Sequence, residues 1–115
     1  MQRGEIRLVS LDPVVGSEAG KRRPAIIVSN DGANTTAARL GRGVLTIVPV
    51  TSNIERIHSF QVLLETADTG LADACKAQAE QVRSVDVQRI GKRIGTVHAS
   101  VMGDLDEALR IHLAL

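Results

Sequence analysis

The sequence predicts a mainly β domain of the α+β class, in which a small antiparallel sheet is followed by a C-terminal helix. Three observations lead to this prediction. Short apolar, β-branched segments alternate with turn residues, the connections between them are long and polar, and helical periodicity is clearest near the end of the chain. The 115 residues suit a single domain over residues 1–115. A βαβ unit with a glycine fingerprint is missing, which argues against Rossmann and P-loop nucleotide binding.

The first predicted strand covers residues 5–11, where apolar and polar side chains partly alternate before the turn at residues 12–13. Residues 15–23 contain two glycines and three consecutive cations, which is typical of an exposed connection. Residues 25–28 are continuously apolar, as expected for a strand that is covered on both faces. Turn residues at 29–32 are predicted to end that strand.

Three more strands are predicted farther along the chain, at residues 44–50, 60–65 and 79–85. The first of them is strongly apolar and contains Pro49, which indicates an edge, a bulge or a strand end. The chain is then expected to leave the sheet at Thr51.

Helical segments are predicted near the C-terminus. Ser84 with Asp86 could cap a single turn that runs through Arg89. A longer helix is predicted over about residues 100–113, with an acidic first turn and an apolar face on which His112 is packed. The acidic residues are Asp104, Asp106 and Glu107, and the face consists of Leu105, Ala108, Leu109 and His112.

The composition is that of a folded protein. Hydrophobic residues make up 43% and charged residues 23% of the chain, so disorder, collagen-like repeats and coiled coil are disfavoured. Phe60 is the only Phe, Trp or Tyr residue, so the core must consist of Ile, Val, Leu and Ala. Because a small aliphatic core is marginally stable, a homodimer that covers more apolar surface is expected.

Charge and cysteine content restrict the setting in which the protein works. The net charge is +1, so binding to nucleic acid would need a local basic patch. A single cysteine cannot form an internal disulfide, and no apolar signal or membrane-spanning stretch is present. We therefore expect a soluble cytoplasmic protein.

The histidines and the cysteine do not predict a metal site. His58, His98, His112 and Cys75 are widely separated and show none of the usual ligand spacings. The histidines could supply an acid-base pair, but a packed His112 is the simpler interpretation. Cys75 is predicted to be structural, because nothing near it in the sequence would lower its pKa. No metal and no other cofactor is expected.

The cations Lys21, Arg22 and Arg23 are the first candidate binding residues. A run of charge is usually a solvated face, but Arg23 directly precedes Pro24 and a buried strand, which would hold its side chain in one direction. A guanidinium fixed in this way suits a phosphate. Thr51 emerges from the end of the other apolar strand, so the two side chains could converge on one anion if the strands are neighbours.

Several motifs in order along the chain resemble the MazF/PemK family of toxin endoribonucleases. The resemblance covers nearly the whole sequence, and each motif alone would be weak. It implies an SH3-like or PemK-type small barrel, a homodimer, cleavage of single-stranded RNA at short sequences and neutralisation by an acidic, MazE-like antitoxin. The motifs are R-G-E-I at 3–6, G-S-E-x-x-x-x-R-P-A-I-I-V-S-N-D at 16–31, V-P-V-T-S-N at 48–53, E-Q-V-R-S-V at 80–85, G-T-V at 95–97 and L-D-E-A-L at 105–109.

The resemblance also implies roles for individual residues. The family's catalytic arginine and threonine fall on Arg23 and Thr51. Arg7 stands where many members have Tyr or Trp, so aromatic stacking contributes less to RNA recognition. The implied RNA-binding positions are Ser17, Asn53, Glu80 and Gln81, with the loop cations Lys21 and Arg22 beside them, and Glu18 is a loop position that contacts RNA.

The chemistry of RNA cleavage suggests what these residues would do. Attack of a 2′-hydroxyl on the adjacent phosphate builds negative charge, which a fixed cation stabilises. Arg23 stays protonated, so it would stabilise charge and could protonate the leaving group. Glu18 could accept the 2′-hydroxyl proton, or it could read a base or serve the structure. Thr51 would hold a phosphate oxygen, and no metal is required.

Two other functions remain compatible with the sequence. The same fold could be a non-catalytic module that binds nucleic acid or a peptide through its basic loop. It could also be a relative of the gyrase-targeting toxins, which act through a C-terminal segment that contains Trp. Residues 112–115 contain no aromatic side chain apart from the imidazole of His112, so the gyrase alternative ranks last.

Overall fold

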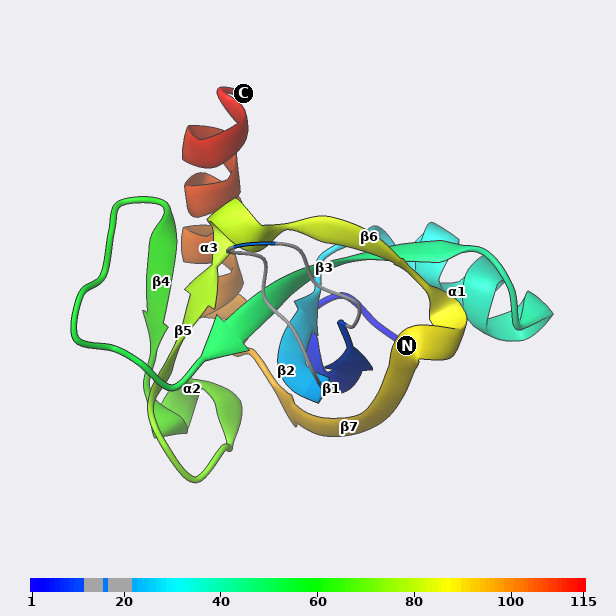
Figure 1. Ribbon diagram of the computed structural model, residues 1–115, viewed down its shortest axis with the longest axis horizontal. Coiled ribbons are helices and arrows are strands. Elements are labelled where there is room, and N and C mark those ends of the chain that lie inside the picture. The colour runs from blue at the N-terminus through cyan, green and yellow to red at the C-terminus, as the bar shows by residue number, and fades with distance from the viewer. Residues whose placement is uncertain (12–15, 17–21) are drawn as a thin grey trace.

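The computed structural model describes residues 1–11, 16 and 22–115, which form a strongly bent antiparallel sheet with helices at its ends (Figure 1). The strands are β1 (Glu5–Ser10), β2 (Arg22–Ile27), β3 (Val44–Thr51), β4 (Gln61–Leu64), β5 (Cys75–Gln78), β6 (Arg83–Asp86) and β7 (Ile90–Thr96). The helices are α1 (Asp31–Leu40), α2 (Thr66–Thr69) and α3 (Ala99–Leu113), with 3₁₀ turns η1 (Ala79–Gln81) and η2 (Val87–Arg89).

The sheet has the strand order β4-β5-β3-β2-β1-β7, and β6 pairs with β3 beside this path. Its centre is β3, whose first four residues pair with β6 and whose last two pair with β5. The predicted α+β class, with a small antiparallel sheet and a C-terminal helix, is confirmed. Among the described strand pairings none joins β7 to β4 or β6, so the sheet is open and is not closed by a full ring of hydrogen bonds.

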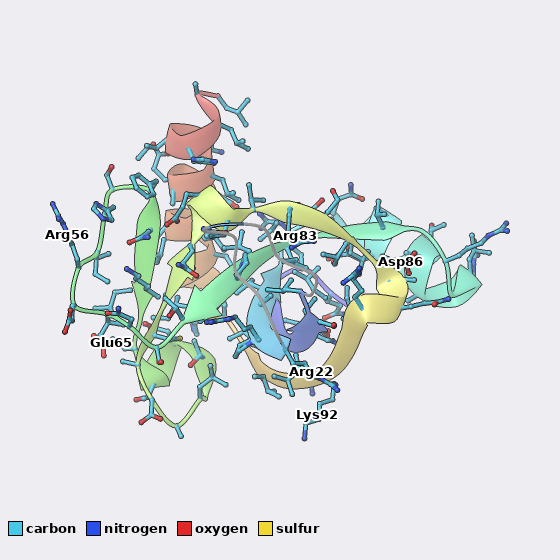
Figure 2. All side chains as sticks on the ribbon, viewed as in Figure 1. Arg22, Arg56, Glu65, Arg83, Asp86 and Lys92 are labelled. Atoms are coloured by element: carbon cyan, nitrogen blue, oxygen red, sulfur yellow. The ribbon has the colours of Figure 1, made fainter. Side chains whose placement is uncertain are left out.

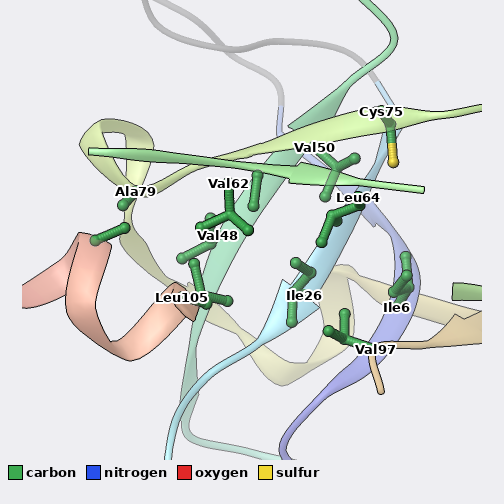
Figure 3. Packing of buried hydrophobic residues seen from close by; sticks show 12 residues of the cluster. Ile6, Ile26, Val48, Val50, Val62, Leu64, Cys75, Ala79, Val97 and Leu105 are labelled. Carbon is green, nitrogen blue, oxygen red and sulfur yellow. The ribbon is translucent and has the colours of Figure 1, made fainter. Parts of the chain in front are cut away.

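Both faces of β2 and β3 are buried. Ile26 and Val48 contribute to a cluster that lies against α3, shown in Figure 3. Their neighbours Ile27 and Ile47 point the other way, into a second cluster that includes Ala37 of α1. The period-two alternation of a strand therefore fills two cores from the same two strands, which explains the continuous apolar run predicted at residues 25–28.

Helix α1 was not predicted, because its sequence has few apolar residues and only Asn34 and Ala37 are buried. The turn chemistry predicted at residues 29–32 in fact starts this helix. The Asn30 side chain accepts a hydrogen bond from the Ala33 amide at 2.9 Å, as an N-cap residue does. Gly41 ends the helix in the left-handed conformation, with φ of 65°.

The strand predicted at residues 79–85 is confirmed only for residues 83–85, which lie in β6, whereas residues 79–81 form η1. The chain turns through η1, so that β5 and β6 pair with different ends of β3. Strand β7 was also missed, because glycines interrupt its pattern. A Cβ atom at Gly91 would lie 2.9 Å from the Leu8 carbonyl oxygen, and one at Gly95 would lie 2.7 Å from the Thr69 carbonyl oxygen. These glycines permit close packing that no larger residue allows.

The predicted C-terminal helix is confirmed as α3, but two of its details differ. The acidic residues lie beyond the first turn, which starts at the cap His98. His112 is exposed and is not packed, because the end of α3 projects past the sheet (Figure 1). The predicted turn through Arg89 is η2, and Asp86 caps it by accepting from the Gln88 amide at 2.8 Å. No helix in the described part of the chain has both the length and the apolar character needed to span a bilayer.

Candidate active site

The structure brings Arg23 and Thr51 to the same cavity. The β2–β3 register pairs Ala25 with Pro49, and the same antiparallel register continued by two residues places Arg23 opposite Thr51. Both residues line a cavity of about 300 Å³ at the end of the two strands. Its lining consists of Arg23, Pro24, Val50, Thr51, Ser52, Leu71, Ala72, Asp73, Ala74, Cys75 and Ile94.

The position of Arg23 follows from its neighbours in sequence and across the sheet. Pro24 restricts the preceding residue to extended backbone, and Arg23 pairs with Val9 of β1. Ala25 and Ile27, just beyond, are fully buried. The guanidinium is thus carried by a strand that is held in place from both sides, while the Arg23 side chain is half-buried at its end.

Thr51 starts a short series of local hydrogen bonds. Its hydroxyl oxygen accepts from the Asn53 amide at 3.3 Å, and the Asn53 side chain accepts from the Glu55 amide at 3.2 Å. These turns leave Asn53 exposed next to the cavity. Because the Thr51 oxygen acts here as an acceptor, its own O–H proton remains available to donate to a substrate oxygen.

The wall of the cavity that residues 71–75 provide was not predicted from the sequence. It brings the exposed carboxylate of Asp73 to the site, from a stretch without a motif. Cys75 belongs to this wall and also to the core cluster, as its predicted structural role requires. Burial raises the pKa of its thiol, which keeps the sulfur protonated near neutral pH and unsuited to nucleophilic attack.

The remaining predicted residues are spread over the molecule. Arg22 is exposed at the start of β2 (Figure 2). Glu80 and Gln81 lie in η1 and do not line the cavity, and a carboxylate oxygen of Glu80 accepts from the Gln61 side-chain amide at 2.6 Å. Predictions on Ser17, Glu18 and Lys21 fall outside the described residues. Among residues 1–11, 16 and 22–115, no group of three or more His, Cys, Asp or Glu side chains could hold a metal ion.

Arg7 stands where many members of the family that the sequence resembles have Tyr or Trp, and its contacts are with other parts of the sheet. Its guanidinium donates to a carboxylate oxygen of Glu5 at 2.9 and 3.0 Å and to the Gly91 carbonyl at 3.1 Å. Burial raises the pKa of Glu5, but hydrogen bonds from Arg7 and from the Gln2 backbone, together with nearby positive charge, outweigh burial and hold that pKa below its ordinary value. Arg7 therefore joins β1 to β7.

Comparison with known proteins places the chain in a family. Residues 2–113 match the family described as PemK-like, MazF-like toxin of type II toxin-antitoxin system. The endoribonuclease MazF9 of Mycobacterium tuberculosis is 59% identical over 115 residues, which cover all of this chain and 98% of that protein.

Solved structures agree with this match. A crystal structure of MazF from Deinococcus radiodurans aligns with a TM-score of 0.82 and 25% identity, over all of this chain and 97% of the other. A MazE–MazF structure from the same organism aligns with a TM-score of 0.75, at 25% identity and over 96% of the other chain. The sheet, the cavity at the ends of β2 and β3, and these matches lead to one conclusion: the chain belongs to the PemK-like, MazF-like toxins of type II toxin–antitoxin systems.

Proposed function

We propose that the chain is a toxin that acts as a metal-independent, sequence-specific endoribonuclease on single-stranded RNA in the cytoplasm, and so inhibits translation and growth. The observation that carries this proposal is the cavity that Arg23 and Thr51 share at the ends of two adjacent strands. The 59% identical relative, which is named an endoribonuclease, supports the same activity.

The reaction would be an internal transesterification. The 2′-hydroxyl attacks the adjacent phosphorus, the P–O5′ bond breaks, and the products carry a 2′,3′-cyclic phosphate and a 5′-hydroxyl. Arg23 stabilises the charge that develops on the phosphate oxygens, and the Thr51 hydroxyl donates to one of them. Glu18 either accepts the 2′-hydroxyl proton or reads a base, in which case water accepts that proton, and the leaving 5′-oxygen takes a proton from Arg23 or from water. RNA binding would involve Ser17, Lys21, Arg22, Asn53, Glu80 and Gln81.

The test is cleavage of a long RNA by the purified protein, with and without EDTA. We expect cleavage to continue in EDTA and the products to carry cyclic phosphate ends. A substrate with a 2′-deoxy nucleotide before the scissile bond should stay intact at that bond. Cleavage that stops in EDTA and returns with magnesium would contradict internal attack, and intact RNA under all conditions would favour a non-catalytic binding module.

Control of this activity would require two protein partners. The proposal includes a homodimer and a cognate, MazE-like antitoxin with an acidic tail that places carboxylates near Arg23 and blocks the RNA path. The MazE–MazF structure from Deinococcus radiodurans supports a partner of this kind. An antitoxin tail peptide from the neighbouring reading frame should displace labelled RNA, whereas simultaneous binding with unimpaired cleavage would contradict this route of inhibition.

A further inference from the structure

Lys76 is a buried lysine beside Thr51. The residue is 8% exposed, and its neighbours Cys75 and Ala77 on β5 point into the core cluster. Alternation along β5 places Lys76 on the opposite face of the sheet. There the register pairs it with Thr51 on β3 and with Leu63 on β4. Side chains paired in this way are direct neighbours, with Cβ atoms about 5 Å apart.

The Lys76 ammonium holds the segment that follows Thr51. Its nitrogen donates to the backbone carbonyl of Arg56 at 2.7 Å, in the middle of residues 52–60, while the Arg56 side chain points away from the molecule (Figure 2). The other described hydrogen bonds of segment 52–60 lie near its ends or within it, at Asn53 and His58. Among the described hydrogen bonds, that of Lys76 alone ties the middle of the segment to β5.

The stability of the fold does not explain why a lysine occupies position 76. An ammonium has three donors, and the Arg56 carbonyl satisfies one of them. None of the ion pairs in the described part of the chain includes Lys76. An apolar side chain would fill the same space without the free energy needed to desolvate a charge. The lysine is therefore better explained by what it holds, the segment that follows Thr51.

We propose that Lys76 is a positioning residue that determines the sequence preference of RNA cleavage. It fixes segment 52–60 against the sheet, so that the exposed Asn53 meets the bases that flank the phosphate at Thr51. The inference rests on the proposed function, because the preference it explains is that of RNA cleavage.

The first measurement needs no RNA. Hydrogen–deuterium exchange is followed in wild type, in Lys76→Met, which keeps an unbranched side chain without donors, and in Lys92→Met, which removes an exposed lysine of β7. We expect exchange over residues 52–60 to become about tenfold faster in Lys76→Met alone, since a hydrogen bond to a charged group is lost. Unchanged exchange in that segment would overturn the positioning role.

The second measurement uses a randomised RNA pool and one oligonucleotide substrate. Lys76→Met should broaden the base preference at the cut sites and raise KM about tenfold, with kcat within about threefold of wild type. Lys76→Arg, which keeps charge and donors, should restore the preference. Lys76→Gln is too short to reach Arg56 and should behave like Lys76→Met, which provides a second variant if the first does not fold.

Each outcome of the second measurement decides the proposal. An unchanged preference and KM in Lys76→Met would overturn it. A fall in kcat at constant KM would overturn it as well, because the lysine would then act on the reacting phosphate. If wild type does not cleave RNA at all, the proposed function fails, whereas the exchange measurement still decides whether Lys76 holds the segment.

Discussion

Arg23 and Thr51 contribute to the proposed reaction in different ways. Arg23 supplies a full positive charge and Thr51 a neutral hydroxyl, so their loss should differ in size. We predict that Arg23→Ala lowers kcat by about 10²- to 10³-fold, and that Thr51→Ala lowers it somewhat less. Both variants should stay folded, because neither side chain is buried. Single-turnover cleavage measures the effect, with Arg42→Ala as control, because Arg42 is exposed in the connection between α1 and β3. Near-normal turnover by Arg23→Ala would reject its role.

The carboxylate of Glu5 makes the free energy of unfolding depend on pH. Its folded-state pKa is lowered, so the unfolded chain binds the proton more tightly and the stabilisation is present above the ordinary pKa of 4.5. It is lost as the pH falls through the lower, folded-state value. Glu5→Gln should therefore lower the free energy of unfolding at pH 7 by about 2 kcal/mol, since Arg7 loses its charged partner.

Thermal unfolding from pH 7 to pH 3 measures this effect. The melting temperature of wild type should fall more steeply below about pH 4.5 than that of Glu5→Gln. Glu107→Gln is the matched control, because Glu107 also pairs with an arginine but is 63% exposed. Parallel curves for wild type and Glu5→Gln would show that this carboxylate does not contribute to the acid sensitivity.

Strand β7 and helix α3 each contain a glycine whose surroundings predict opposite effects of the same substitution. At Gly95 a Cβ atom would meet the Thr69 carbonyl oxygen at 2.7 Å, whereas at Gly103 nothing lies within 4 Å. Gly95→Ala should destabilise the protein by about 2 kcal/mol or more, because backbone must move. Gly103→Ala should stabilise it by about 0.5–1 kcal/mol, through helix propensity and a less flexible unfolded chain. Urea unfolding of both variants tests the pair, and equal effects would contradict the packing of β7.

Over the whole molecule, the net charge of +1 limits how RNA can be held. Without a strong overall field, affinity must depend on a few local phosphate contacts, so its salt dependence should be shallow. Removing one such contact in Arg22→Ala should weaken binding to all RNA sequences and reduce the slope of log K against log salt by about one. Fluorescence anisotropy at several salt concentrations measures the slope. An equal change in Arg42→Ala would show that the effect is not local to the proposed site.

The elements that can be predicted from the sequence are those with a clear pattern of apolar residues. Strands β1 and β4 and helix α3 were predicted because their apolar residues follow a strand or helix period, and β2 and β3 because their apolar runs are continuous. Helix α1 has almost no apolar face, and β7 is interrupted by glycines that packing requires. Such elements are determined by caps and close approaches between segments that are distant in sequence.

The same distinction applies to the site. Arg23 and Thr51 could be paired because each stands at the end of a buried strand, and the register of β2 and β3 places them together. Asp73 and Lys76 could not be found in this way. Asp73 lines the cavity and Lys76 lies beside Thr51 because β5 pairs with β3, which no local pattern in residues 70–78 predicts.

Strands β2 and β3 supply side chains to both hydrophobic clusters. The positions of Arg23 and Thr51, at the ends of these strands, therefore depend on the packing of both clusters. A cavity made by shortening Leu105 of α3, or Leu45 in the other cluster, loosens the same pair of strands. Mutations at many positions should therefore inactivate the proposed toxin. If cells that survive its expression are selected and the gene is sequenced, most inactivating substitutions should lie at core positions throughout the chain, and only a minority at residues that line the cavity.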